Sequence, residues 1–153
     1  MNVAAKPDPY AVFRPRRGRQ YALGFAVAQL AVFVVLAFVL PLSDFGGWAV
    51  SDSVMLVALG LLIGWALSRF AALRATPSPV GIVVRNIVVT TTVEWSQVVG
   101  VRFSGGDPWA YLDLASGDDL AVMAIQKSDG PFARSEAGRL AALAQAHRDR
   151  RPA

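Results

Sequence analysis

Few side chains in this sequence could carry out acid–base or nucleophilic chemistry. The 153 residues include no cysteine and a single histidine, His147. A thiolate nucleophile and a cysteine metal site are therefore excluded, and His147 has no evident nucleophile as a partner. The adjacent carboxylates Asp118 and Asp119 follow Ser-Gly, which is turn chemistry, and neighbouring strand residues point to opposite faces. We predict no catalytic residue, no metal site and no bound cofactor, and hence a protein that is not an enzyme.

Binding by basic side chains is better supported than catalysis. The net charge of +4 comes from residues 1–20, and the remainder of the chain is neutral overall. This distribution disfavours binding to nucleic acid, which requires a basic folded surface. Arginines beside a membrane attract anionic lipids at about 1 kcal/mol each. The candidate lipid contacts are Arg14, Arg16, Arg17 and Arg19, with the alternative that these residues only set membrane topology.

Three further side chains could form a ligand or partner surface. Arg85 and Arg102 could meet an anionic headgroup, although the surrounding segment has no basic cluster. Trp109, with Trp95, could form a platform for a ligand. A tryptophan in a small β domain more often fills the core, because it buries a large apolar area. The candidate surface therefore comprises Arg85, Arg102 and Trp109.

Two apolar segments could place these groups at a membrane. Residues 21–42 carry no charge and would span about 33 Å as a helix, against a hydrocarbon core of roughly 30 Å. A second span is predicted at about residues 48–68, with Asp52 near one end. The alternatives are a cleaved signal peptide for the first segment and a buried soluble helix for the second. Gly60 and Gly64 form a G-x-x-x-G pattern that favours packing between the two spans over dimerisation.

The arginines around these spans predict their orientation. Four arginines precede the first span, Arg69 and Arg74 follow the second, and the loop at residues 43–53 has none. Positively charged flanks stay in the cytoplasm. We therefore predict a multi-pass protein of the plasma membrane, with both termini cytoplasmic and the loop outside.

The remainder of the chain has the pattern of a small β domain. A break at Thr76-Pro-Ser-Pro precedes short β-branched or alternating segments, and an amphipathic helix is predicted at residues 131–147. The strands are expected at residues 81–86 and 87–92, or as one bent strand over both, and at 93–104, 109–115 and 120–125. In the segment 93–104, the apolar face of a half-buried strand is expected to hold Val99, Val101 and Phe103. The predicted domains are a basic cytoplasmic arm (1–20), a transmembrane hairpin (21–75) and a cytoplasmic β domain (80–150).

The last segment resembles a bacterial pleckstrin-homology-like (PH-like) domain, in its actinobacterial form joined to a two-helix membrane anchor. The resemblance covers about residues 80–146. Its landmarks are Arg85-Asn86, Trp95, Val101-Arg102-Phe103, Trp109, the Gly117 hairpin and Ala124-Ile125-Gln126. It implies a partly open, seven-stranded β-barrel or sandwich capped by a C-terminal α-helix. The expected fold class is α+β, with a two-helix transmembrane hairpin before this PH-like domain.

The resemblance implies a fold and a location but no reaction. We therefore expect an integral membrane protein that presents a PH-like module as a protein-binding adaptor, or as an accessory subunit of an envelope or respiratory complex. The alternative is a module that responds to lipid headgroups. The expected partners are membrane lipids and another membrane or membrane-associated protein.

Overall fold

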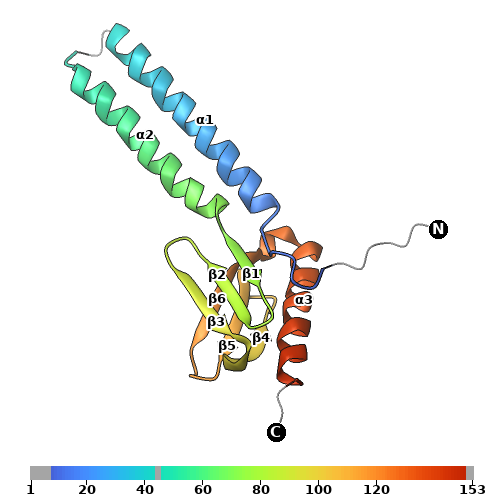
Figure 1. Cartoon of the computed structure of the whole chain (residues 1–153). Coiled ribbons are helices and arrows are strands. Elements are labelled where there is room, and N and C mark those ends of the chain that lie inside the picture. Colours follow the sequence, from blue (N-terminus) through green and yellow to red (C-terminus); the bar gives the residue numbers. More distant parts are fainter. Residues whose placement is uncertain (1–7, 44–45, 151–153) are drawn as a thin grey trace. The chain divides into compact units, whose positions relative to one another are not determined.

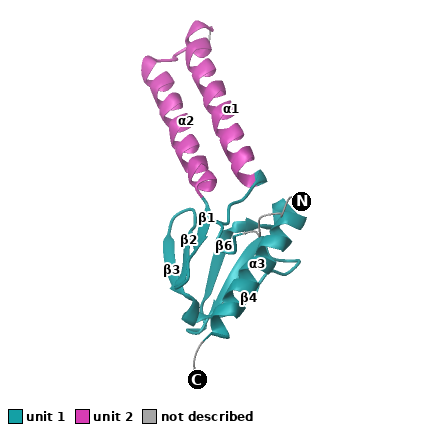
Figure 2. Ribbon diagram, turned by 45° about the vertical axis from the view of Figure 1, so that its right-hand side comes forward, with its two compact units in different colours: residues 1–17, 73–153 teal, residues 18–72 magenta. Residues whose placement is uncertain are grey.

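The chain folds into two compact units, one helical and one mostly β (Figure 2). The computed structural model describes residues 8–43 and 46–150. The helical unit is residues 18–72, and the second unit combines residues 1–17 with 73–153. The β unit is thus interrupted in the sequence by the whole helical hairpin. The predicted arm and outer loop each include residues outside the described ranges.

The helical unit consists of two long apolar helices. Helix α1 is Arg17–Val39, followed by the short 3-10 helix η1 at Leu40–Leu42, and α2 is Val50–Ala71. By length and composition, both are able to cross a membrane. Asp52 lies in the first turn of α2, where its carboxylate accepts the Ala49 backbone N–H, so the charge stays at the helix end. Large apolar side chains along both helices are exposed, as contact with lipid requires.

The two helices contact each other closely at Gly60. A Cβ placed on Gly60 would lie 3.0 Å from the Phe33 ring and 3.2 Å from Leu30 on α1. The Gln29 side chain donates a hydrogen bond of 2.8 Å to the Gly60 carbonyl oxygen, which gives this polar group a partner inside the hairpin. The small residue therefore serves the packing of the two helices on each other.

The β unit contains two antiparallel three-stranded sheets and a C-terminal helix (Figure 1). In the first sheet the order is β1-β2-β3, and in the second it is β4-β5-β6. The strands are β1 Arg74–Pro77, β2 Gly81–Arg85, β3 Thr90–Glu94, β4 Val98–Arg102, β5 Trp109–Leu114 and β6 Asp119–Gln126. Two 3-10 turns, η2 at Trp95–Gln97 and η3 at Lys127–Asp129, precede β4 and helix α3 (Pro131–Arg148) respectively. The predicted α+β class with a PH-like domain is confirmed. The described residues form six strands rather than seven, and an isolated bridge between Phe13 and Ala75 extends the first sheet beyond β1.

One apolar core joins both sheets to α3. Trp95 is buried, in keeping with the core role favoured for it. The apolar stripe of α3 is buried as well, with Leu140 fully inaccessible and the helix packed mainly against β4. The core members are Phe13, Ala75, Ile82, Val84, Val93, Trp95, Val98, Ala110, Leu112, Val122, Ala124, Ile125, Ala133, Ala137, Leu140, Leu143 and Ala144.

Two local predictions from residue periodicity were wrong. The expected strand at residues 87–92 is instead a turn followed by β3, because residues 86–89 close a hairpin through the Asn86 N–H and the Val89 carbonyl. Val99, Val101 and Phe103 were expected on one buried face, but Val99 does not lie on it. A β-bulge between Val98 and Gly100 buries Val98 and leaves Val99 half exposed.

The β unit also differs from the predicted boundaries of 1–20, 21–75 and 80–150. It includes Leu73, the whole of β1 and an N-terminal stretch that contains Phe13. Thr76 and Pro77 of the proline-rich break belong to β1. The backbone nitrogen of Pro77 faces away from β2, so its missing N–H removes no hydrogen bond between the two strands. A fragment of residues 80–150 therefore lacks one strand and the fully buried Phe13 ring.

We expect Leu140→Asp to unfold the β unit. The side chain is fully buried, so the substitution places an unpaired carboxylate in the core at a cost of several kcal/mol, against a total stability of about 5–15 kcal/mol. The measurement is thermal unfolding of the full chain in detergent, followed by near-ultraviolet circular dichroism. Ala142→Asp, on the exposed side of the same helix, is the matched control and should leave the transition unchanged. Equal transitions for both variants would remove α3 from the core.

Candidate functional site

The N-terminal segment is held on the β unit by backbone and aromatic contacts. Phe13 and Ala75 exchange two backbone hydrogen bonds, of 2.9 Å and 3.0 Å. The Phe13 ring is fully buried, and the Arg139 guanidinium lies 3.7 Å above it. Arg139 also donates to the carbonyl oxygens of Pro9 and Ala11. The segment predicted as a free basic arm is therefore part of the domain for much of its length.

Asp129 fixes the point at which this segment passes into α1. Its buried carboxylate accepts the backbone N–H groups of Arg16 and Arg17, each at 2.9 Å. Among the candidate lipid contacts, Arg16 packs its guanidinium 3.7 Å above the Phe132 ring. All four candidates, Arg14, Arg16, Arg17 and Arg19, are exposed. The four arginines thus lie along the segment that Asp129 holds before and at the start of α1. Their contact with lipid stays a prediction.

His147 occupies a structural position between two aromatic residues. Its Nδ1 lies 2.8 Å from the Leu143 carbonyl oxygen, its Nε2 lies 3.1 Å from the Tyr10 hydroxyl, and its ring stacks on Trp95. A carbonyl oxygen only accepts, so Nδ1 is the donor in its bond to Leu143. Nδ1 therefore fixes the ring on its own helix, and Nε2 joins the N-terminal segment to α3.

Arg102 is held by carboxylates of its own sheet. Its guanidinium lies 2.5 Å from Asp119 and 3.4 Å from Asp113, beside the Tyr111 ring. The hydrogen bond to Asp119 raises the pKa of Arg102. In the neighbouring turn, the hydroxyl and N–H groups of Ser104 lower the pKa of Asp107. These groups are exposed, and ion pairs of this kind contribute about 0–1 kcal/mol. Arg102 is therefore exposed but already paired with two carboxylates of its own sheet.

The other two members of the predicted partner surface lie on different elements. Arg85 ends β2 in the first sheet, directly opposite Arg74 of β1. Trp109 begins β5 in the second sheet and is half-buried, and its indole N–H has no hydrogen-bond acceptor among the described residues. Within the described part of the chain, no hydrogen bond, ion pair or ring contact joins Arg85 to Arg102 or Trp109. The three side chains do not form one contact network there.

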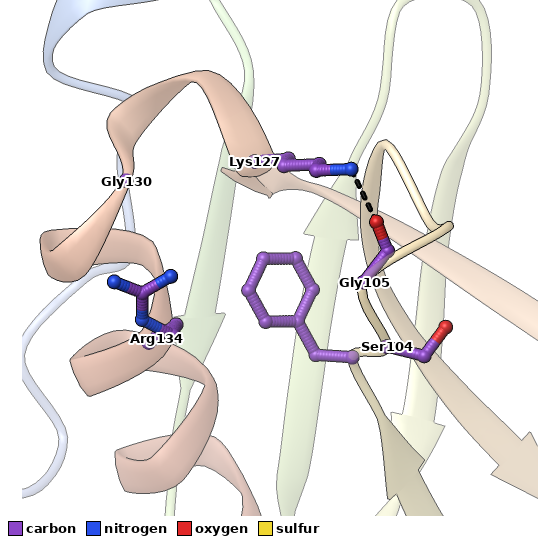
Figure 3. A pocket seen from close by; sticks show the side chains of 6 residues that line it. Ser104, Gly105, Lys127, Gly130 and Arg134 are labelled. Carbon is purple, nitrogen blue, oxygen red and sulfur yellow. Dashed lines mark hydrogen bonds between the residues drawn. The ribbon is translucent and has the colours of Figure 1, made fainter.

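A small pocket opens beside the start of α3. Phe103, Ser104, Gly105, Lys127, Gly130 and Arg134 line it, and its volume is about 100 Å³. Figure 3 shows Lys127 reaching to the Gly105 carbonyl oxygen, with Arg134 in the first turn of α3 on the other side. Pockets for drug-sized ligands are typically about 300–1,000 Å³. This pocket therefore suits at most a small anionic group.

Asn86 is a positioning residue whose role the sequence did not reveal. Its amide nitrogen donates 2.8 Å to the Ala121 carbonyl oxygen, and its amide oxygen accepts the Met123 N–H at 3.2 Å. These bonds join the end of β2 to the outer edge of β6. An asparagine directly after a strand is ordinary turn chemistry, so the sequence held no signal for a link between sheets.

The sheet edges differ in how they are covered. Phe13 pairs with β1, Asn86 with β6, and the Arg148 guanidinium with the Val99 carbonyl oxygen of β4. In the described residues, the corresponding contact on β3 is confined to its last residue, Glu94. The hairpin register directs the backbone groups of Thr90 and Thr92 away from β2. At the next outward position, the Gln97 side chain occupies the Glu94 N–H. A short, polar, hydrogen-bonding edge is thus open at β3.

We expect Asp129→Ala to loosen the N-terminal segment without unfolding the β core. Two backbone N–H groups lose their acceptor, at a cost of about 1–3 kcal/mol if they stay buried. The measurement is the rate of trypsin cleavage after Arg16 and Arg17 in the full chain, which should rise. Asp118→Ala, in the exposed turn before β6, is the control. Unchanged cleavage in the Asp129 variant would show that Phe13 and Arg139 hold the segment alone.

The comparisons with known proteins agree with this architecture. A model of the bacterial PH domain family matches residues 71–144. Three mycobacterial proteins, one from Mycobacterium bovis and two from strains of Mycobacterium tuberculosis, are each 35% identical to the chain over 128 residues. The match covers 83% of this chain and 83% of each relative, and all three are described as uncharacterized proteins. No solved structure gives a significant match.

Proposed function

The chain belongs to the bacterial PH domain family, and we propose that it is a non-enzymatic, multi-pass membrane protein whose PH-like domain binds another protein. The domain serves as an adaptor or as an accessory subunit of a membrane complex of the envelope or respiratory chain. The partner is a membrane or membrane-associated protein.

The open edge of β3 carries this proposal. Extended segments bind to exposed sheet edges through main-chain hydrogen bonds, with alternate side chains giving specificity. Thr90 and Thr92 offer outward N–H and C=O groups, and the exposed side chain of Val83 lies on the neighbouring strand, opposite Thr92. Natural proteins usually protect such an edge by covering it. An extended segment of a partner would complete the first sheet along the outward backbone groups of Thr90 and Thr92.

The orientation of the membrane spans supports a cytoplasmic domain. Arginines flank both helices on the side of the β unit, and the described part of the connecting loop has no lysine or arginine. Positive flanks stay in the cytoplasm, so both termini are cytoplasmic and the loop is outside. A protein partner would then be met in the cytoplasm or within the membrane.

A second candidate function is recognition of lipid headgroups. The observation that favours it is the pair of cations, Lys127 and Arg134, at the pocket beside Gly130. Asp129, the residue before Gly130, accepts the backbone N–H of Arg17, where α1 begins. The pocket therefore lies close to the chain that enters the first span, where an anionic headgroup is within reach.

The predicted topology is tested by labelling single cysteines. Because the chain has no cysteine, Gly46→Cys and Ser116→Cys each introduce one reactive thiol. In intact cells, an impermeant maleimide should label the variant at 46 and spare the variant at 116. Permeabilised cells are the control, in which both should react. Labelling at 116 but not at 46 in intact cells would reverse the orientation.

Protein binding at β3 is tested by comparing Thr92→Pro with Thr92→Val. Proline removes the outward N–H and is tolerated on a strand edge, whereas valine keeps the backbone donor and the branched shape. After purification in mild detergent, a stoichiometric partner should be retained by wild type and Thr92→Val and lost from Thr92→Pro. Retention by both variants would exclude β3 as the binding edge. Selective binding of purified wild-type protein to one anionic headgroup, with no protein retained, would favour the second function.

A further inference from the structure

The hairpin turn between β2 and β3 exposes two apolar side chains at its tip. Val88 is 82% exposed and Val89 is 60% exposed. Tight turns usually carry Gly, Asn, Asp, Ser or Pro, so paired valines are not explained by turn chemistry. The turn closes through a 3.0 Å hydrogen bond from the Asn86 N–H to the Val89 carbonyl oxygen. These valines are therefore displayed by an ordered turn.

The strand register places this tip at the end of the domain from which both helices depart. Arg85, the last residue of β2, lies opposite Arg74, the first residue of β1. The β2–β3 turn extends beyond Arg74 and Arg85, at the end of the first sheet where the chain enters β1 from α2. Phe13 is antiparallel to Ala75, so the chain after Phe13 also runs toward the start of β1 and enters α1 at Arg17. Figure 1 shows the β2–β3 turn at this end of the β unit.

The tip is anchored to the rest of the domain. Asn86, its first residue, is bonded through its side-chain amide to the backbone of Ala121 and Met123 on β6. A flexible loop could fold its valines back onto the domain. This turn is fixed at its base on both sheets, so Val88 and Val89 stay at the surface.

The charges beside the tip are those of a membrane-binding surface. Arg74 and Arg85 lie together at its base, and the first sheet has no acidic residue at this end; Glu94 lies at the far end of β3. Apolar side chains flanked by cations bind membranes by entering the boundary between headgroups and acyl chains while the cations meet anionic lipids. A second protein could also cover two valines. The lipid surface is favoured because the chain itself enters the membrane from this end of the sheet.

We propose that Val88 and Val89 insert into the headgroup region of an anionic lipid surface and that Arg74 and Arg85 contact its phosphates. The contact adds a third attachment of the domain to the membrane, beside the two helix connections. This inference rests on the membrane anchorage in the proposed function, but it does not depend on protein binding at β3.

The test uses the full chain with one cysteine, at Val88 or at Ser116, labelled with an environment-sensitive fluorophore. Ser116 is the matched control because it lies in an exposed turn just before β6. The other end of this eight-residue strand leads to Asp129, which binds the backbone at Arg17, so Ser116 lies at the end of β6 away from the connection to α1. Eight residues of strand extend about 26 Å. The protein is reconstituted in vesicles of phosphatidylglycerol and phosphatidylethanolamine. Circular dichroism of each labelled variant verifies the fold.

Insertion predicts that the label at 88 is quenched by lipid-borne nitroxides at about 5–10 Å below the phosphates and protected from aqueous iodide. The label at 116 should show the opposite behaviour. Equal access of iodide to both labels would overturn the proposal. Protection at 88 in native membranes but not in the pure lipid vesicles would also overturn it, because a protein would then be the occupant.

A second arm tests the arginines. In vesicles of phosphatidylcholine, or with Arg74→Gln and Arg85→Gln together, nitroxide quenching at 88 should fall, since the attraction to anionic phosphates is removed. Equal quenching under all conditions would overturn the assignment of an anionic surface. The topology labels at 46 and 116 are read on the same preparations. A reversed orientation there is a failure of the proposed function, whereas correct orientation with an aqueous label at 88 is a failure of this inference alone.

Discussion

The backbone pair between Phe13 and Ala75 is the constraint on which the β unit depends. These residues lie on either side of the entire helical hairpin in the sequence, and their two hydrogen bonds close it into a loop at the domain. The buried Phe13 ring then joins the common core, Arg139 covers it, and Asp129 holds the next turn of chain. Because Phe13 pairs antiparallel to Ala75, both connections to the helices leave from the same end of the first sheet.

This arrangement explains why some parts of the structure could be predicted from sequence and others could not. The helices of the hairpin were predictable because the uncharged apolar runs at residues 21–42 and 53–68 have few other stable environments. Helix α3 was predictable from its capping proline and apolar stripe. The boundaries of the β unit were not, because the pairing of Phe13 with Ala75 has no local signature. Pro77 made the difficulty greater, since a proline in an outward strand position is indistinguishable in sequence from one in a linker.

The candidate site residues show the same division. The turn role predicted for Asp118 is confirmed, because its carboxylate accepts the Ser116 hydroxyl within the turn. The turn role predicted for Asp119 is wrong, because this residue begins β6 and pairs with Arg102. Arg102 was singled out as a binding residue, but the register of β4, β5 and β6 places it beside Asp113 and Asp119. Its pairing with Asp119 depends on the approach of β6, which the neighbours of either residue in the sequence do not reveal. Asn86 was recognised only as a landmark. Its role depends on the approach of β6, a strand 35 residues later in the chain.

The strand edges of the β unit differ in how far other parts of the chain satisfy their backbone groups. Phe13, Asn86 and Arg148 each satisfy backbone groups at a strand edge, and each comes from a different part of the chain. An edge that no such contact covers retains unpaired donors and acceptors, which normally invites unwanted association. In β3 this exposure is limited to a five-residue strand with three threonines, so the edge is polar and short. Such an edge binds weakly by itself. A membrane-held partner would compensate, because confinement of both proteins to one surface raises their effective concentration without any additional contact.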